Sequence, residues 1–190
     1  MKSILDVCCG GRMWWFDKND ERAVFMDKRT YDGMLCDGRH FEVKPDILGD
    51  FINIPFPNEN FYLVVFDPPH LEKVGDSSWL CTKYGRLPKD WQEKLTKAFA
   101  ECFRVLKPFG ILVFKWNEEQ IRLSEILKLT PEKPVVMHKR QKTHFCYLYE
   151  RRNSPKMNDN FYIAVSARTT LKDGKRGTER FLKRLQEAVK

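Results

Sequence analysis

The sequence predicts an α/β protein built on a mostly parallel sheet. Along the 190 residues, short apolar runs alternate with stretches of helical periodicity, as in folds that cross from strand to strand through helices. Two runs, 61–66 and 111–114, are apolar throughout, which is typical of central strands covered on both faces. Small, acidic or aromatic residues follow the predicted strands, at the edge where open α/β sheets bind their ligands.

The first half of the chain offers four strands and little helix. Strands are predicted over 3–7 and 23–26, a third ends near 49–51, and a fourth covers 61–66. Only the segment 11–22 separates the first two strands. Because a parallel crossover needs about a dozen residues, the first helix should be short.

The second half carries the main helix. Over 89–106, apolar residues recur at helical spacing opposite charged ones, which indicates a surface helix that packs one face on the sheet. The next strand, 111–114, should be the neighbour of 61–66 in the sheet. Three further elements are expected: a helix around 121–127 and a final strand pair, 134–137 and 144–149.

The most informative motif is Asp67-Pro68-Pro69-His70, which follows the strand 61–66. An Asp carboxylate beside a proline-stiffened backbone can accept the N–H bonds of a planar amino group, and an amine held this way is a better nucleophile. Proline has no backbone N–H and fixes φ, so a carbonyl in this motif can face a substrate. The alternative is a turn in which the prolines stop the strand and Asp67 caps the next helix.

The other strand ends suit a nucleoside-shaped cofactor. The first strand runs into Cys8-Cys9-Gly10-Gly11, a loop small enough for close backbone approach to a ligand. The second strand ends at Asp27, about 20 positions after the glycine loop. Dinucleotide-binding folds place at this separation the acidic residue that binds a ribose hydroxyl. The third ends at 49–51, Gly-Asp-Phe.

Together these motifs resemble those of the class I S-adenosylmethionine-dependent methyltransferases, and among them the amino-methyltransferases that carry Asp/Asn-Pro-Pro-aromatic. The likeness covers about residues 3–149: segment 4–10, Ile-Leu-Asp-Val-Cys-Cys-Gly, is similar to the family's first motif, and 103–113 to its helix-to-strand passage. It implies a Rossmann-like fold, with a mostly parallel seven-stranded sheet, an antiparallel last strand and, in this chain, reduced helices.

The resemblance also implies a role for each strand end. S-adenosylmethionine would be the cofactor, with its methionine end in the first motif, its ribose at Asp27 and its adenine at 50–56. The predicted catalytic residues are Asp67, Pro68, Pro69 and His70, and the predicted cofactor-binding residues are Asp6, Cys8, Cys9, Gly10, Asp27, Asp50 and Phe51.

The chain departs from the family pattern in two places. The family's first glycine is Cys8 here, and its third is replaced around Arg12. The fourth motif ends in His70 instead of Tyr, Phe or Trp, and an imidazole is a poorer stacking platform that titrates near neutrality. A stacked base would then lie on Trp79 or Tyr84.

Two segments are predicted to contact the substrate. In 71–89, aromatic residues lie between basic ones, which fits a stacked nucleobase, although a flexible connection would read the same way. The basic turn 138–144 could clamp phosphates, although a solvated charge run is the alternative. The predicted substrate-binding residues are Trp79, Lys83, Tyr84, Arg140 and Lys142.

Composition excludes several classes of protein. A chain of 190 residues with 42% hydrophobic residues suits one domain with a full core. No run reaches membrane-spanning length and the start does not resemble a signal peptide, so a cytoplasmic protein is expected. The six cysteines form no Cys-x-x-Cys pair, so we expect reduced thiols and no metal site.

Positive charge gathers in the last part of the chain. We expect a methyltransferase domain over 1–150 and a basic extension over 151–190. The extension holds 11 Lys and Arg against 4 Asp and Glu, so it carries +7 of the chain's net charge of +8. Such a tail would bind RNA or DNA through phosphates. A disordered or solubilising tail is the alternative. An apolar helical face within 178–189 needs a partner, so a homodimer or a partner subunit is left open.

The function expected from the sequence is S-adenosylmethionine-dependent methylation of an exocyclic amine, adenine N6 in RNA or DNA. Three alternatives stay open. The same chemistry could act on a protein or a small-molecule amine, or the chain could be a non-catalytic nucleic-acid-binding or scaffold protein. A nicotinamide-dependent oxidoreductase is the third, although the chain contains no G-x-G-x-x-G.

Overall fold

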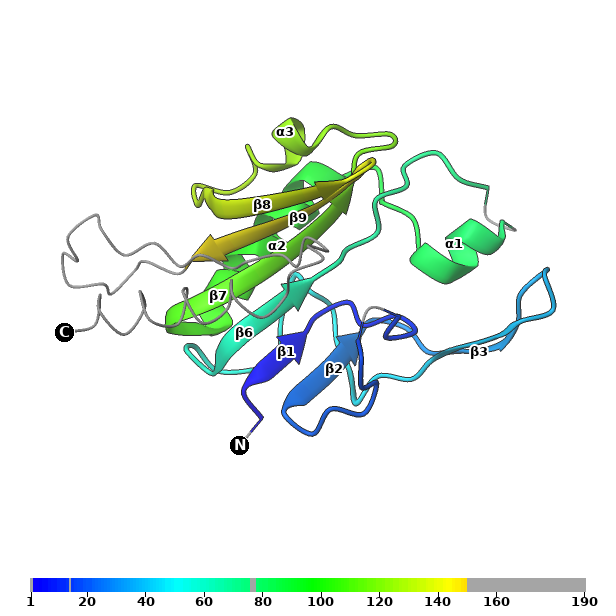
Figure 1. The fold of residues 1–190 in the computed structure, drawn as a ribbon, viewed down its shortest axis with the longest axis horizontal. Coiled ribbons are helices and arrows are strands. Elements are labelled where there is room, and N and C mark those ends of the chain that lie inside the picture. Colours follow the sequence, from blue (N-terminus) through cyan, green and yellow to red (C-terminus); the bar gives the residue numbers. More distant parts are fainter. Residues whose placement is uncertain (1, 14, 76–77, 150–190) are drawn as a thin grey trace, which may run out of the picture. The chain divides into compact units, whose positions relative to one another are not determined.

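The structure, a computed structural model, describes residues 2–13, 15–75 and 78–149. These residues form an α/β fold around a seven-stranded sheet (Figure 1). The strands of this sheet are β1 (Ile4–Asp6), β2 (Ala23–Asp27), β5 (Ile47–Leu48), β6 (Phe61–Phe66), β7 (Leu106–Asn117), β8 (Pro134–Arg140) and β9 (Thr143–Tyr149). The other elements are the hairpin β3 (Tyr31–Met34) and β4 (His40–Val43) and the helices α1 (Trp79–Tyr84), α2 (Trp91–Val105) and α3 (Leu123–Ile126).

The sheet confirms the predicted fold class, a mostly parallel Rossmann-like sheet with an antiparallel last strand. Its strands lie in the order β5-β2-β1-β6-β7-β9-β8. All pairs from β5 to β7 are parallel, whereas β9 is antiparallel to both of its neighbours. The predicted pairing of 61–66 with 111–114 is present as β6 against β7. Along the chain, the order of strands reverses between β1 and β6, which makes this point the topological switch of the sheet.

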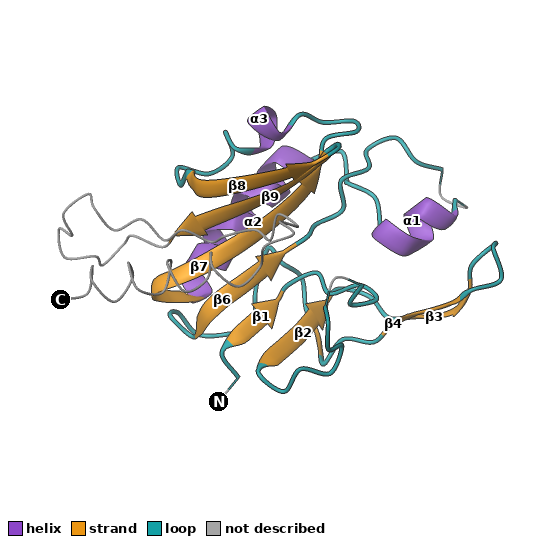
Figure 2. Cartoon of the chain, in the orientation of Figure 1, coloured by secondary structure: helices purple, strands orange, loops and turns teal. Residues whose placement is uncertain are grey.

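One face of the sheet packs on α2, the long helix that Figure 2 shows behind the strands. The predicted helix 89–106 is therefore confirmed to within two residues at each end. Side chains of β7 alternate: Leu112, Phe114 and Trp116 are fully buried, and the residues between them are partly exposed. The buried set packs with the apolar face of α2 in the main core, and each such side chain removed from water stabilises the fold by about 1.5–3 kcal/mol.

The crossover between β1 and β2 differs from the prediction, because the described residues of 11–22 form turns and no helix. Two side chains cover this part of the sheet instead. The indole of Trp15 packs edge-on against Phe25 with ring centroids 4.8 Å apart, and the guanidinium carbon of Arg12 lies 3.8 Å from the centroid of the same ring. An aromatic ring and a flat cation thus occupy the place of a helix that so short a crossover cannot form.

The segment 71–89, expected as a loop, contains the short helix α1. Ser78 begins it by accepting a hydrogen bond from the backbone N–H of Leu80 at 3.3 Å. The hairpin β3–β4 was not expected, and it carries its own small cluster of Leu35, Phe41 and Val43.

Residues 150–190 lie outside the described residues, and so does everything predicted for the basic extension. In the part of the chain that the structure describes, no helix has the length and apolar character needed to cross a membrane.

Candidate functional site

A cavity of about 230 Å³ lies at the carboxyl ends of β1, β2 and β6. Its walls come from the loop after β1, from the residues that follow β2, β5 and β6, from Lys115 of β7 and from the end of α1. This is the switch point at which open α/β sheets bind ligands. The predicted site residues that line it are Cys8, Cys9, Gly10, Asp27, Asp50, Phe51, Asp67, Pro68, Pro69, His70, Lys83 and Tyr84.

Asp6, which was predicted to bind the cofactor, does not line the cavity, because none of its surface is exposed. Its carboxylate accepts hydrogen bonds from the indole N–H of Trp15 at 2.7 Å and from the backbone N–H of Cys8 at 3.2 Å. The pKa of Asp6 is raised to about 7, mainly by burial; the two hydrogen bonds lower it and the nearby charges of Asp67 and Asp27 raise it, and the value includes these effects. Asp6 therefore orients the loop after β1 and responds to charge in the cavity.

The loop after β1 folds back onto the end of β2. The backbone N–H of Gly10 donates to Oδ2 of Asp27 at 2.9 Å, and that of Arg29 donates to Oδ1 at 3.2 Å. Gly10 has a φ of +47°, which a glycine adopts without strain, and no atom lies near the place of a Cβ. Burial raises the pKa of the neighbouring thiols of Cys8 and Cys9, so both stay protonated at neutral pH and present a weakly polar wall.

The segment after β5 is fixed by α2. Arg104 donates to the carbonyls of Ile54 and Phe56, both at 2.8 Å, and Glu101 accepts from the N–H of Ile54 at 2.8 Å. In the same segment, Phe51 packs edge-on against Phe66 of β6, with ring centroids 5.7 Å apart. An apolar ring is thereby held at the wall of the cavity.

Asp67 forms an ion pair that the sequence alone did not predict. Lys115 Nζ contacts Asp67 Oδ2, and both side chains are about three-quarters shielded from solvent. The register explains the contact: Phe66 is paired with Phe114 in the parallel β6–β7 ladder, so the next residue of each strand lies side by side. The signal in the sequence is a lone lysine within the apolar run 111–116.

His70 lies against Tyr84, with ring centroids 5.8 Å apart, and against Trp116 at 6.4 Å. Burial lowers the pKa of His70, with an opposing effect from Asp67 and a reinforcing one from Lys115. The imidazole is therefore neutral at neutral pH. The two flat rings of His70 and Tyr84 form one wall of the cavity.

The end of α1 is held over the cavity from two sides. Arg29, two residues beyond β2, donates to the carbonyls of Thr82 at 2.7 Å and Lys83 at 3.2 Å. Gly85 follows the helix with a φ of +75°, and a Cβ on it would lie 3.0 Å from Cγ of Pro69. The helix that carries Lys83 and Tyr84 thus rests on the Asp67–His70 motif.

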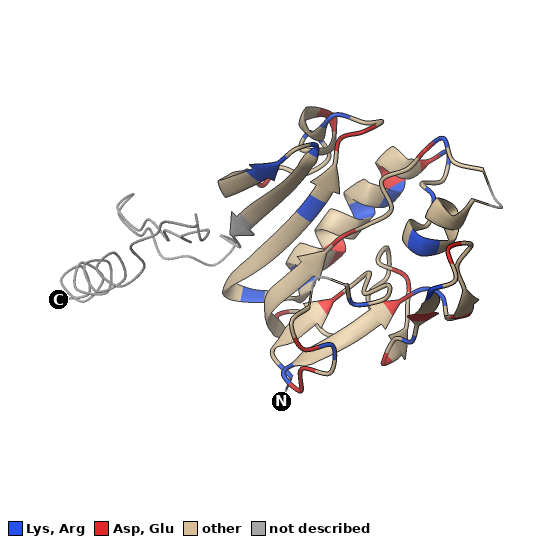
Figure 3. Cartoon of the chain, turned by 45° about the vertical axis from the view of Figure 1, so that its right-hand side comes forward, with Lys and Arg blue, Asp and Glu red and all other residues tan. Residues whose placement is uncertain are grey.

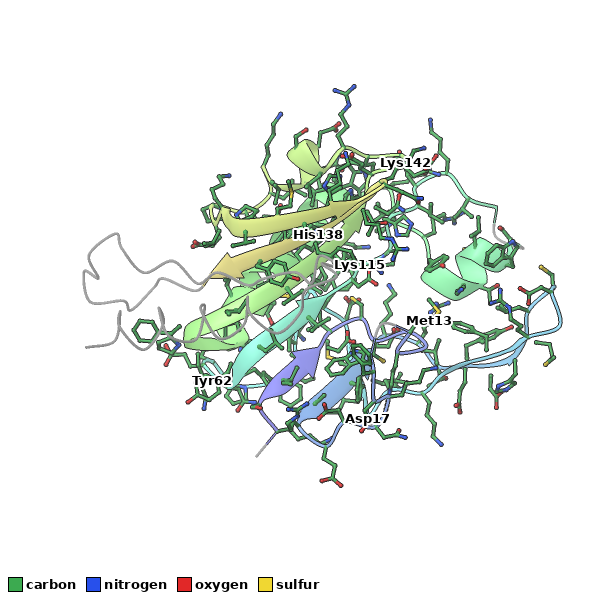
Figure 4. The ribbon with its side chains drawn as sticks, viewed as in Figure 1. Met13, Asp17, Tyr62, Lys115, His138 and Lys142 are labelled. Carbon is green, nitrogen blue, oxygen red and sulfur yellow. The ribbon has the colours of Figure 1, made fainter. Side chains whose placement is uncertain are left out.

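Three predicted substrate contacts do not line this cavity. Trp79 lies at the start of α1 with 38% of its surface exposed, and Arg140 and Lys142 lie at the β8–β9 turn. Lys142 pairs with Glu119 at 2.6 Å. Figure 4 shows Lys142 at the tip of that hairpin, away from Met13 at the cavity wall. In the segments that the structure describes, no cluster of three or more His, Cys, Asp or Glu residues could hold a metal ion.

Comparison with known proteins supports the fold. No family model matches the chain, and no curated protein matches it either. Among solved structures, the chain is similar to the PH0226 protein from Pyrococcus horikoshii OT3, with a TM-score of 0.52 and 15% sequence identity. The match covers 78% of this chain and 82% of that chain. At this identity the likeness shows the shared fold alone.

Proposed function

We propose that this chain is an S-adenosylmethionine-dependent methyltransferase that acts on an exocyclic amine, adenine N6 in a nucleic acid. The observation that carries the proposal is the state of Asp67. Its Oδ2 is taken by Lys115, whereas its Oδ1 accepts no hydrogen bond from the described residues, and Asp67 lines the same cavity as the flat rings of His70 and Tyr84. A planar N–H donor is the group that such an acceptor would bind.

The cofactor-binding side of the cavity fits a nucleoside with a charged tail. Asp27 and Asp50 bring carboxylates that accept from ribose hydroxyls and from adenine, and Phe51 brings the apolar contact. Gly10 leaves space for close approach of the methionine end, because nothing lies within 4 Å of a Cβ built there. When bound, S-adenosylmethionine supplies an electrophilic methyl group on a sulfonium.

The chain's own contribution is positioning. Asp67 Oδ1 and the carbonyl of Pro68 would accept the two N–H bonds of the amine and so turn its lone pair toward the methyl group. As the N–C bond forms, the S–C bond of the sulfonium would break, and the nitrogen would release its extra proton to water. The ring of Pro69 fixes φ directly after that carbonyl and so stiffens the backbone that presents it. Holding two reactants in line contributes about 7–11 kcal/mol to lowering a barrier of this kind.

The charge around the cavity favours an anionic acceptor. Three aspartates line the cavity, Asp27, Asp50 and Asp67, and they are outnumbered by basic residues. The basic lining residues are Lys28, Arg29, Lys83, Arg86, Lys94 and Lys115. A protein or small-molecule amine without negative charge would gain nothing from this excess. A base within a duplex would have to be flipped out to reach the cavity, so an unpaired adenine is the favoured acceptor.

The test combines binding and transfer. Calorimetric titration with S-adenosylmethionine and S-adenosylhomocysteine should give binding that Asp27→Ala removes. Tritiated methyl groups should then pass to adenine-containing single strands, with N6-methyladenine recovered after digestion, and Asp67→Ala should abolish transfer while it leaves cofactor binding in place. Transfer that survives Asp67→Ala would refute the assigned amine site, and the absence of cofactor binding would refute the enzyme.

A further inference from the structure

A second groove, of about 830 Å³, adjoins the candidate pocket. Its walls are the loop after β1, the segments around Lys18 and Lys44, and the hairpin β3–β4. Gly10, Gly11, Met13 and Lys83 line both spaces, so the groove runs directly into the pocket. Figure 4 shows Met13 between α1 and the hairpin, where the two spaces meet.

The groove is lined mainly by cations. Five basic residues face two carboxylates, those of Glu42 and Asp46: the basic residues are Arg12, Lys18, Arg39, Lys44 and Lys83. Asp46 is already paired with Arg12 at 3.0 Å and with Lys2 at 3.3 Å. Figure 3 shows the basic position on α1 next to the hairpin with its mixed charges.

Three of the lysines keep their charge available. Within the described parts of the chain, the ammonium groups of Lys18, Lys44 and Lys83 contact no carboxylate. Lys83 Nζ lies 5.8 and 5.2 Å from the ring centroids of Trp79 and Tyr84. Cations placed beside aromatic rings and left without a counterion are suited to a phosphate chain with stacked bases.

The groove is a built feature and not a gap between loose loops. The guanidinium of Arg12 donates to the carbonyls of Lys18 at 2.6 Å and Lys44 at 2.8 Å, which fixes the backbone that carries both lysines. The hairpin packs closely on the other side, because a Cβ on Gly11 would lie only 2.7 Å from Cε2 of Phe41. These walls therefore hold the lysines in a set arrangement.

We propose that this groove binds the phosphate backbone of a single-stranded nucleic acid and leads its target base into the pocket. The inference rests on the proposed function for the identity of the base, but the groove's charge and its continuity with the pocket stand apart from catalysis. The site differs from the basic extension 151–190 and from the β8–β9 turn. RNA and DNA share the chemistry that the groove recognises.

The test is the binding of fluorescein-labelled single strands of RNA and of DNA to the full chain, followed by anisotropy over a range of salt. The groove variant is Lys18→Glu with Lys44→Glu. A matched control, Lys97→Glu with Lys128→Glu, makes the same change of charge on exposed lysines outside both spaces. A third variant, Lys183→Glu with Arg184→Glu, probes the basic extension.

The groove variant should bind single strands about tenfold or more weakly, and the slope of log affinity against log salt should fall by about 1.4, since two phosphate contacts are lost. The control should bind like the wild type. The inference is overturned if the groove variant binds like the control, or if only the extension variant loses affinity. Competition by poly-glutamate as strong as that by a single strand would point to an acidic protein and would overturn it too.

The two proposals fail separately. If the wild type binds no S-adenosylmethionine but the groove variant still loses its affinity for single strands, the proposed function falls and the groove stands. If cofactor binding and methyl transfer are present and the groove variant is unaffected in strand binding, the groove inference falls alone. The melting temperature of each variant shows that a loss of binding is not a loss of folding.

Discussion

Lys115 on β7 pairs with Oδ2 of Asp67 at the end of β6, and both residues line the cavity. The ammonium compensates the negative charge that a methyl acceptor would otherwise meet. An aspartate with its charge balanced in this way offers much the same acceptor as a neutral asparagine. This gives a physical reason why either residue would serve at the first position of the motif.

Lys115→Met should therefore reduce methyl transfer, because it leaves Asp67 as an uncompensated, three-quarters shielded charge whose rotamer is no longer fixed. We expect kcat/KM to fall about tenfold or more. Asp67→Asn in the Lys115→Met background should restore part of the loss, since an amide needs no counterion. The double-mutant cycle should thus show coupling of about 0.5–3 kcal/mol.

The matched control for this cycle is Lys139→Met. Lys139 lies on β8, outside the cavity, and its Nζ pairs with Oε1 of Glu118 at 2.9 Å. The side chain of Lys139 is 53% exposed. Its loss should leave kcat/KM unchanged. Strictly additive effects of Lys115→Met and Asp67→Asn would contradict the role given to the pair.

Asp6 should make the protein less stable as the pH rises. Its pKa is 3.8 in the unfolded chain and about 7 in the folded one, so between these values the folded state holds the proton more tightly. The stability that Asp6 contributes is fully present below its unfolded pKa and is lost as the pH rises from the unfolded to the folded pKa. Above the folded pKa, the stability no longer changes with pH on account of this group. The total is on the order of 4 kcal/mol for a shift of about three units.

Asp6→Asn should remove this dependence. The amide cannot accept both hydrogen bonds, from Trp15 and Cys8, and so starts from a lower stability at acid pH. When urea midpoints are measured from about pH 4 to about pH 8, the midpoint of Asp6→Asn should approach or pass that of the wild type as the pH rises. The exposed Asp17, labelled in Figure 4, gives the control Asp17→Asn, and equal slopes for wild type and Asp6→Asn would show that Asp6 is not the titrating group.

His70 should act as a flat neutral ring and not as a base. Because burial lowers its pKa, kcat/KM should be flat with respect to this residue at neutral and alkaline pH and should fall only in acid, as the ring becomes cationic beside Lys115. His70→Phe should keep transfer within about threefold and lose that acid limb. His70→Ala should cost about tenfold, the size of a lost base–ring contact.

The pH profiles of kcat/KM for the wild type, His70→Phe and His70→Ala show whether His70 acts as a flat ring or as a base. A general base at His70 would predict the opposite, that phenylalanine is as damaging as alanine. Cofactor affinity serves as the internal control, since His70 is not among the residues predicted to hold the cofactor.

Strand positions and strand-end chemistry could be predicted from the sequence because each depends on local pattern. The strand 61–66 was predicted with the bounds that β6 has, and Asp67 follows it as expected. Most of the cofactor and motif residues then line one cavity, because the carboxyl ends of parallel strands meet at one edge of a sheet.

Other features depend on contacts that no local pattern encodes. The pairing of Lys115 with Asp67 needs the register of β6 against β7. Trp15 covers the part of the sheet where a helix was expected, and this depends on the tertiary packing of its indole on Phe25. The hairpin β3–β4 did have a local signal, the turn dipeptide Asp37-Gly38 before the alternating segment 40–43.

Gly85 should set the distance between α1 and the Asp67–His70 motif. At φ +75° and ψ 180°, a conformation that almost only glycine adopts, alanine is strained by about 1–3 kcal/mol, and its Cβ would press on Pro69 Cγ at 3.0 Å. Gly38 has a φ of +78° with nothing within 4 Å of a Cβ, so Gly38→Ala carries backbone strain without the clash. Both variants should lose stability in urea. Only Gly85→Ala should lower kcat/KM for the nucleic acid, by about tenfold or more, because it displaces Tyr84 and Pro69 from each other while cofactor affinity stays the same. Equal kinetic effects of the two substitutions would show that backbone strain alone, and not the seat of α1 on Pro69, explains the loss.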